Sequence, residues 1–457
     1  MQIDITRNHK PVIISKKNEL VIFFLAFILR FFSLCIVFIN ITYLVPDSFD
    51  YIRLARGIIE NNIYGLPGNP EIFRVPLYPF LLSGFMLLFK THFISALLLS
   101  QVILDSITAI LVIKSVYFLF QEESNRIGFI AGILYSLSPL CIVYSTKVLS
   151  ETVFVFLFML LFVMSLKVMS RDNINANSVL FCLIFIGILA GILCLTRAIF
   201  IPLAVLFLLW FALRIKKVKY ILVVTVCFSL ILSLWAIRNY HVCGYTGITS
   251  VSAVFMYRYD ACSVLAKIHS ISFAEQQSKI DAELGKISNQ KEIAEYCVKK
   301  TFSVIKTHPF LYAFLQCKNS INIFLPAVNE LLESFGIVIG GKGTLSIIHS
   351  MGLIQGIKHY FNGRYDLLVI TLPLAFALLI FYGFVLYGIF LAIRKFEKII
   401  IMDHLFILLL FVYFFIVGGA AATPRFRVPI EPFLCIYASI GIFFLIKRYE
   451  TNRFTRS

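Results

Sequence analysis

The charged residues best suited to chemistry lie in one polar stretch, residues 46–79, which reads PDSFDYIRLARGIIENNIYGLPGNPEIFRVPLYP. Only 14% of the 457 residues are charged, so this much charge after the first apolar run indicates binding or catalysis. The stretch contains four acids and three arginines: Asp47, Asp50, Glu60, Glu71, Arg53, Arg56 and Arg74. Its first part predicts a short helix that begins at Pro46, because a proline loses no hydrogen bond in the first turn. The second part is rich in Pro and Gly and predicts a loop.

Two carboxylates are candidates for a general base that takes a proton from an attacking hydroxyl. Asp47 follows the first apolar run, and Glu151 follows SPLCIVYSTKVLS in the short turn between the third and fourth runs. Both are expected at the same outer membrane surface, where they would face one cavity. The alternatives are a carboxylate that interacts with a helix N-terminus for Asp47 and a solvated turn residue for Glu151.

Basic residues are expected at the same surface, in the turns between apolar runs. They are Arg74, Lys147, Arg197, Arg238, Arg425 and Arg427. Arginine is disfavoured on the outer side of a membrane, so these exceptions are informative. Arginine holds phosphate oxygens through paired N–H donors, and such a group suits a lipid-linked phosphate. The alternative is contact with anionic lipid head groups.

Motifs for other chemistry are missing from the sequence, which contains no GxxxxGK[ST], HExxH or GxSxG. Six histidines are expected on the outer side, but they are scattered, and no two have the spacing of metal ligands. One of them could ligate a divalent metal together with Asp47 or Glu71. A divalent metal therefore stays an open alternative, and no other cofactor is expected.

The elements that must position these residues are transmembrane helices. Hydrophobic residues make up 60% of the chain, and the mean hydropathy is +0.91. Continuous apolar runs of about 20 residues predict an all-α, polytopic transmembrane helix bundle rather than a β-barrel. About ten spans are expected, near 19–45, 93–120, 127–145, 149–168, 178–196, 198–213, 219–237, 366–393, 401–421 and 428–446. PFLLSGFMLLFK and HPFLYAFLQCKNSINIFLP are read as interfacial helices or as two further spans, for a total of up to about twelve.

Charge placement predicts the topology. The net charge of +17 comes from Lys and Arg at the ends of apolar runs, which is the positive-inside pattern and not a nucleic-acid surface. Both termini are then cytosolic in a multi-pass protein of the cell membrane. The expected parts are a tail at 1–18, a transmembrane module at 19–237 with an outer loop at 46–92, a large outer loop with interfacial helices at 238–365, helices at 366–446 and a tail at 447–457.

Several short motifs, taken together, resemble the GT-C glycosyltransferases, in the branch of the protein O-mannosyltransferases and lipid A aminoarabinose transferases. In chain order they are PDSFDYIRLA, RVPLYP, SP…LSET, TR at 196–197, WAIRNY and PRFRVPIEP. Each motif alone is weak, but they cover most of the chain in the order of the family.

The resemblance implies a sugar donor carried on a polyprenyl phosphate and an outer-face acceptor such as a glycolipid, a glycan or a protein, with inversion at the anomeric carbon. It also implies that Asp47 is the general base, that Glu151 lines the cavity and that Arg74, Arg238 and Arg425 hold the departing phosphate. The full set of candidates for substrate binding is Asp50, Tyr51, Arg74, Tyr78, Lys147, Arg197, Arg238, Asn239 and Arg425.

Two departures from the family pattern argue against two of the reactions that its members catalyse. Some relatives have an Asp-Glu pair where Ser48 follows Asp47 here, and aminoarabinose transferases have a Glu-Lys pair where this chain reads EIFRVP. Both argue against protein mannosylation and aminoarabinose transfer as the specific reaction. The rival function is a transporter, flippase or ligase for polyprenyl-linked glycans. We find no internal repeat of the kind that marks many transporters.

Overall fold

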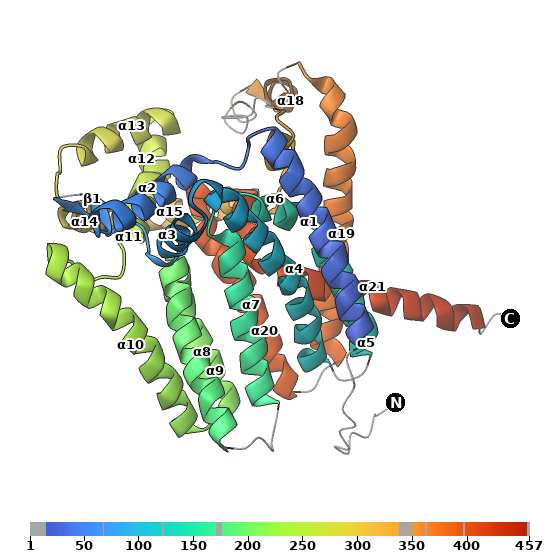
Figure 1. The fold of residues 1–457 in the computed structure, drawn as a ribbon. Coiled ribbons are helices and arrows are strands. Elements are labelled where there is room, and N and C mark those ends of the chain that lie inside the picture. Colours follow the sequence, from blue (N-terminus) through green and yellow to red (C-terminus); the bar gives the residue numbers. More distant parts are fainter. Residues whose placement is uncertain are drawn as a thin grey trace.

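The computed structural model describes residues 15–454 except 67, 121–122, 171–175, 338–346, 348–350, 362 and 396–397. The expected terminal tails therefore lie partly outside the described residues. Long helices form a bundle, and shorter helices cover one end of it (Figure 1). The bundle helices are α1 (Lys16–Ile39), α4 (Phe93–Leu119), α5 (Ser124–Leu137), α6 (Pro139–Ser145), α7 (Glu151–Met169), α8 (Ala176–Thr196), α9 (Phe200–Ile215), α10 (Val218–Cys243), α19 (Leu368–Lys395), α20 (Lys398–Gly418) and α21 (Glu431–Phe454).

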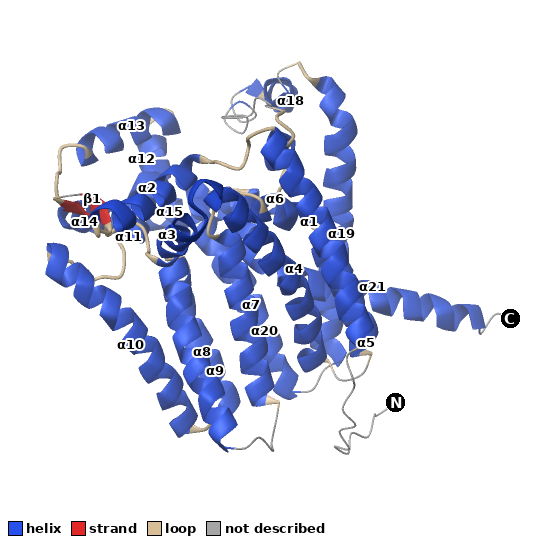
Figure 2. Cartoon of the chain, viewed as in Figure 1, coloured by secondary structure: helices blue, strands red, loops and turns tan. Residues whose placement is uncertain are grey.

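The covering end is formed by the two loops that were expected on the outer side. The first loop holds α2 (Pro46–Asn61), β1 (Gly65–Leu66), β2 (Asn69–Pro70), α3 (Leu77–Phe89) and η1 (Lys90–His92). The long loop holds α11 (Val251–Phe255), η2 (Met256–Ala261), α12 (Cys262–His269), α13 (Phe273–Leu284), α14 (Gln290–Thr307), α15 (Pro309–Ser320), η3 (Ile321–Phe324), α16 (Val328–Ser334), α18 (Leu353–Phe361) and η4 (Tyr365–Leu367). Two further short helices, η5 (Gly419–Ala421) and η6 (Pro424–Ile430), join α20 to α21. Within the described residues, the paired strands β1 and β2 form the one small sheet among the helices (Figure 2).

The predicted all-α transmembrane bundle is confirmed. Eight helical stretches of the described chain are long and apolar enough to cross a membrane, and one of them, Leu77–Leu119, includes α4. The pair α5 and α6, bent by 57°, makes a ninth, and the shorter apolar α9 matches the remaining predicted span. Each of the ten predicted spans therefore has a helical counterpart.

Neither doubtful segment forms a separate long helix. The helix α3 has 13 residues and stops at Lys90, where a positive φ of 46° turns the chain into α4. The helix α15 has 12 residues and packs against α20 and η5. Helices of this length span only about 20 Å, less than the roughly 30 Å of a bilayer core.

The two ends of the described chain lie at the same end of the bundle. Glu19 in the first turn of α1 faces Lys114 near the end of α4, at 4.0 Å. Lys447 in α21 pairs at 3.2 Å with Glu123, which precedes α5. Since α4 ends just before α5 begins, both pairs mark one surface, opposite the covering loops (Figure 1).

An arginine in the first span explains how α1, α4 and α5 pack. Arg30 is fully buried and donates to Asp105 of α4 at 2.5 Å. Its other nitrogens donate to the carbonyls of Ala26, Tyr135 and Ser136, and the Tyr135 hydroxyl donates to Asp105. A charge this deep in a bundle is tolerated because its donors are bonded.

Replacing Arg30 by methionine should destabilise the protein by about 3–5 kcal/mol, because Asp105 is left charged and buried. The double variant Arg30→Met, Asp105→Leu should recover part of that loss. Unfolding of the detergent-solubilised protein measures both. Lys114→Met, at the half-exposed pair with Glu19, is the control and should change little. A double variant no more stable than the single one would count against this account.

Candidate functional site

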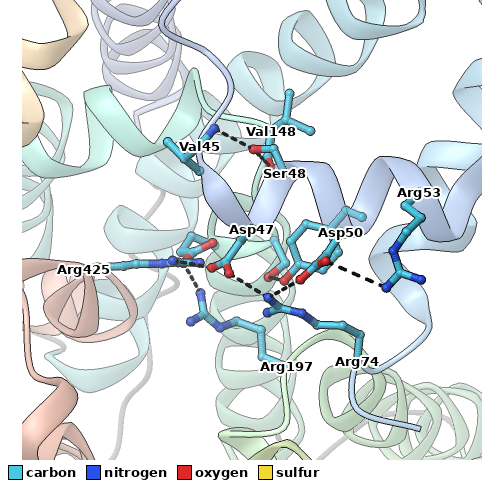
Figure 3. Close-up of polar contacts among 12 residues, drawn as sticks. Val45, Asp47, Ser48, Asp50, Arg53, Arg74, Val148, Arg197 and Arg425 are labelled. Atoms are coloured by element: carbon cyan, nitrogen blue, oxygen red, sulfur yellow. Dashed lines mark hydrogen bonds and ion pairs between the residues drawn. The ribbon is translucent and has the colours of Figure 1, made fainter. Parts of the chain in front are cut away.

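The site is built on the first turn of α2, which is fixed to the turn before α7. Pro46 begins the helix and Asp47 lies in its first turn. The Ser48 hydroxyl accepts the N–H of Val45 at 3.0 Å and donates to the carbonyl of Val148 at 2.9 Å. Figure 3 shows these two bonds above Asp47. Ser48, which departs from the family pattern, therefore joins the turn that carries Asp47 to the turn that precedes Glu151.

Five charged residues form the centre of a connected network of charges at this end of the bundle, which continues through Asp50 to Arg53 (Figure 3). Asp47 pairs with Arg74 at 2.7 Å and with Arg425 at 2.6 Å, one arginine on each carboxylate oxygen. Arg425 also pairs with Glu151, which is fully buried, and Arg197 pairs with Glu151 at 2.6 Å. Within this cluster, three arginines surround two carboxylates.

Two further candidates contact Arg74. Asp50 accepts from the Arg74 guanidinium at 2.9 Å, and the ring of Tyr51 lies 5.4 Å beneath it. Tyr78 packs edge-on against Tyr51, but its hydroxyl donates to Gln101 at 2.7 Å, away from the cluster. Asp50 and Tyr51 therefore hold Arg74 in place, and Tyr78 supports Tyr51 from behind.

The cluster keeps Asp47 ionised. Burial opposes the charge, but the guanidinium groups of Arg425 and Arg74 outweigh it and lower the pKa of Asp47 to about 2. Burial also opposes the charge of Arg74, but the Tyr51 hydroxyl and the carboxylates of Asp47 and Asp50 outweigh it and raise the pKa of this guanidinium. At neutral pH Asp47 and Arg74 are therefore both charged.

Arg74 is positioned by a buried acid and by an arginine of α10. Glu71 is 5% exposed and accepts the backbone N–H groups of Phe73 at 2.7 Å and Arg74 at 3.3 Å. Arg238 donates to the carbonyl of Glu71 at 2.7 Å and to that of Tyr64 at 2.8 Å. Arg238 thus holds the backbone of the segment that carries Arg74, and phosphate binding by it stays a prediction.

Two other candidates also bind backbone rather than the cluster. Asn239 donates to the carbonyls of Gly247 and Ile248, which shapes the start of the long loop. Lys147 is buried and donates to the carbonyl of Thr42 at 2.5 Å, and burial lowers its pKa. Substrate contact by either residue stays a prediction.

The sequence analysis named Arg427 among the outer-surface cations but did not predict that it and Glu431 fix the helix that carries Arg425. In the 3₁₀ helix η6, residues two apart point to different sides, so Arg427 points away from the site. It pairs with Glu431 at 3.0 Å and donates to the carbonyls of Ile323 and Leu325. The sequence contained a signal for this arrangement: Arg425 and Arg427 are two residues apart, and Glu431 follows Arg427 by four residues.

The arrangement of side chains does not favour a metal ion. Both carboxylate oxygens of Asp47 and Oε1 of Glu151 contact guanidinium groups, and Oε2 of Glu151 is buried without a hydrogen-bond partner. Among the residues that the structure describes, no group of three His, Cys, Asp or Glu side chains is placed to hold a metal ion. These side chains therefore do not fit a metal in this arrangement.

Comparison with known proteins supports the same family. Residues 70–236 match the family model of dolichyl-phosphate-mannose-protein mannosyltransferases, a stretch that includes Arg74, Glu151 and Arg197 but not Asp47. The crystal structures of the Archaeoglobus fulgidus oligosaccharyltransferase share the fold. The complex with Zn and sulfate has a TM-score of 0.51 at 14% identity, covering 93% of this chain and 50% of that one. The apo form has 0.53 at 13%, covering 97% and 52%.

The chain has the GT-C fold. The predicted resemblance to the protein mannosyltransferase family is confirmed over residues 70–236, and the predicted fold is confirmed by the solved structures. The chain spans about half the length of these solved structures. The apo structure of ArnT from Cupriavidus metallidurans aligns with a TM-score of only 0.38 at 10% identity, over 93% of this chain and 78% of that one. The comparison with curated proteins gives no match.

Arg238→Ala should loosen the segment 62–76 that carries Arg74. Hydrogen bonds from a charged donor contribute about 1.5–3 kcal/mol, so the local opening that a protease needs becomes about tenfold to more than a hundredfold more frequent. Limited proteolysis of the full chain, with mapping of the cut sites, measures this. Arg238→Lys should have a smaller effect, and Arg364→Ala, at the exposed pair with Asp366, none. Equal cleavage in all variants would refute the positioning role.

The charge of Asp47 should make stability depend on pH in the acid range. Its folded-state pKa of about 2 lies below the roughly 3.9 of an unfolded aspartate. The stabilisation is fully present above about pH 4 and is lost as the pH falls toward 2. Acid unfolding in detergent should show that the wild type loses more stability in this range than Asp47→Asn.

Asp260 provides a control of opposite sign. Its burial raises the pKa to about 6, although the N–H of Ala420 and the Gln316 side chain oppose the shift. The wild type should therefore gain stability relative to Asp260→Asn as the pH falls from about 6 to 4. Parallel curves for wild type, Asp47→Asn and Asp260→Asn would contradict both assignments.

Proposed function

We propose that this protein is a membrane glycosyltransferase that moves a sugar from a polyprenyl-phosphate donor to an acceptor hydroxyl at the outer membrane surface. The observation that carries the proposal is the Asp47 carboxylate held between the guanidinium groups of Arg74 and Arg425. The matched family's name includes a sugar on dolichyl phosphate, which is a polyprenyl-type donor. The acceptor is a glycolipid, a glycan or a protein.

The arginines suit the leaving group of this reaction. A sugar linked to a lipid phosphate needs no nucleotide, because the departing phosphate is already a good leaving group. Charge develops on its oxygens as the anomeric bond breaks, and fixed cations lower the barrier to that step. Arg74, Arg197 and Arg425 come from three separate segments and converge beside the two acids, so they would bind several phosphate oxygens at once.

Asp47 has a different task before and after the donor binds. In the resting cluster its low pKa makes it a weak base. A phosphate that draws Arg74 and Arg425 toward itself would remove the two interactions that lower this pKa, so the carboxylate becomes more basic when the donor is in place. It would then accept the proton as the acceptor oxygen attacks the anomeric carbon, and a single displacement of this kind inverts that carbon.

The proposed function also assigns a role to each part of the chain and a side of the membrane to the site. The transmembrane module 19–237 with its loop 46–92 would supply Asp47, Arg74, Glu151 and Arg197. Helices from the long loop 238–365 cover the same end of the bundle and would close over the acceptor (Figure 1). With the site on the outer side, both termini are cytosolic and the protein resides in the cell membrane.

The deciding experiment is transfer of labelled sugar from membrane-embedded polyprenyl-phosphate donors, with wild type and Asp47→Asn at equal expression. Loss of a general base should slow transfer by about 10²–10⁴-fold while donor binding is retained. Asp281→Asn, at a half-exposed pair with Arg258 in the long loop, is the matched control and should transfer normally.

Full activity of Asp47→Asn would remove Asp47 from the mechanism and point to Glu151. A wild type that transfers nothing from a broad donor panel, yet moves intact lipid across the bilayer, would replace the transferase by a flippase.

A further inference from the structure

A groove lies outside the proposed site, on the face of α2 that points away from Asp47. It has a volume of about 580 Å³, within the range of small-molecule sites. Its apolar lining comes from four segments, the end of the α1–α2 connection, α2, β1 and the start of α4: Leu44, Phe49, Ile52, Leu66, Phe93 and Ile94. Phe49 is 60% exposed, so the groove presents apolar surface that nothing in the described chain covers.

Helical geometry separates this groove from the Asp47 cluster. At 3.6 residues per turn, Phe49, Arg53, Arg56 and Glu60 share one face of α2. Asp47 lies on the opposite face, with Tyr51 and Leu54. In Figure 3, Arg53 lies at the far end of the cluster from Arg425. A ligand in the groove would therefore bind behind α2 and not at the reacting atoms.

The groove lies at the membrane surface. Phe93 and Ile94 begin the spanning helix α4, and Leu44 follows the spanning helix α1. Leu87 and Leu88, just before the α3–α4 turn, are 63% and 78% exposed. Large apolar side chains this exposed at the end of a span are expected to face lipid. The groove is thus placed beside the expected lipid-facing surface, at the start of one spanning helix and after the end of another.

The polar rim carries two guanidinium groups. Arg56 is exposed and forms no hydrogen bond or ion pair with any residue that the structure describes. Arg53 pairs with Glu71 at 3.2 Å and weakly with Asp50 at 3.8 Å. Glu60 also lines the rim, so the lining carries two cations and one anion, and Arg56 is the cation without an acidic partner among the described residues.

We propose that this groove binds an anionic phospholipid of the surrounding leaflet. The phosphate would accept from Arg56 and Arg53, and the first part of an acyl chain would lie on Phe49, Ile52 and Phe93. Apolar surface next to unpaired arginine at a bilayer surface matches an amphiphilic anion. A soluble anion would not use the apolar lining, and a neutral lipid would leave Arg56 unpaired.

The bound lipid would act on α2 through Arg53. A phosphate on this guanidinium competes with Asp50 and Glu71, and both of these acids contact Arg74 or its backbone. Filling the groove would thus change the charge balance beside Asp47 without touching it. This second lipid would give the protein a dependence on the anionic lipid content of its membrane.

Lipid binding to the purified full-length protein tests the proposal without any assay of transfer. Native mass spectrometry and thermal shift would compare added phosphatidylglycerol, phosphatidylcholine and polyprenyl phosphate. We expect phosphatidylglycerol to bind preferentially and to raise the melting temperature. Arg56→Gln should weaken its binding by on the order of tenfold. The control Lys267→Gln removes one exposed positive charge from α12 and should leave binding unchanged.

Three results would overturn the proposal. Equal binding of phosphatidylcholine would remove the role of the phosphate charge, and equal weakening by Lys267→Gln would reduce the effect to net charge. Binding of polyprenyl phosphate alone, dependent on Arg56, would reassign the groove to the donor. None of these outcomes depends on whether the protein is a transferase.

Discussion

The ionic contacts of Arg425 determine how the candidate site is held together. This one guanidinium bonds Asp47 and Glu151, residues separated from it by 378 and 274 positions in the chain. Asp47 lies in the first turn of α2, Glu151 begins α7, and Arg425 lies between α20 and α21. Moving any of these elements alone would leave a partly buried charge without its partner, which is far more costly than losing a surface pair. The charges therefore set the relative position of helices whose apolar sides would pack in several ways.

The same constraint operates deeper in the bundle. Arg30 pairs with Asp105 between α1 and α4, and Arg214 pairs with Asp403 between α9 and α20. Apolar side chains of spanning helices gain little from choosing one neighbour over another, because lipid tails are equally apolar. Paired charges and small polar contacts supply the specificity that hydrophobic burial does not. At the covered end, Glu151 is buried, but Asp47 and the arginines around it keep partial solvent exposure, unlike Arg30 and Asp105. That access makes Asp47 and its arginines usable for chemistry.

Much of this was predictable from the sequence. Runs of about 20 apolar residues identify spanning helices because the bilayer imposes their length. Asp47, Arg74, Glu151, Arg197 and Arg425 were expected at one surface, and the structure brings them into one cluster. This prediction needed only the order of the spans, because loops on the same side of a bundle must pack close to one another. The bend between α5 and α6 at Ser138 and Pro139 was not predicted, since the apolar run continues through it.

The roles of Arg238, Asn239 and Lys147 show where sequence reasoning ends. All three were expected at the outer end of the bundle, and all three donate hydrogen bonds to backbone carbonyls. An arginine that holds a loop and an arginine that holds a substrate require the same residue type at the same depth. What separates them is whether a carboxylate or an orphaned carbonyl lies within reach, and that depends on long-range packing. A backbone carbonyl stays next to its arginine because the fold holds the backbone in place. Carboxylate partners such as Asp47 can be exchanged for a phosphate, so the arginines that pair with acids are the ones free to bind substrate.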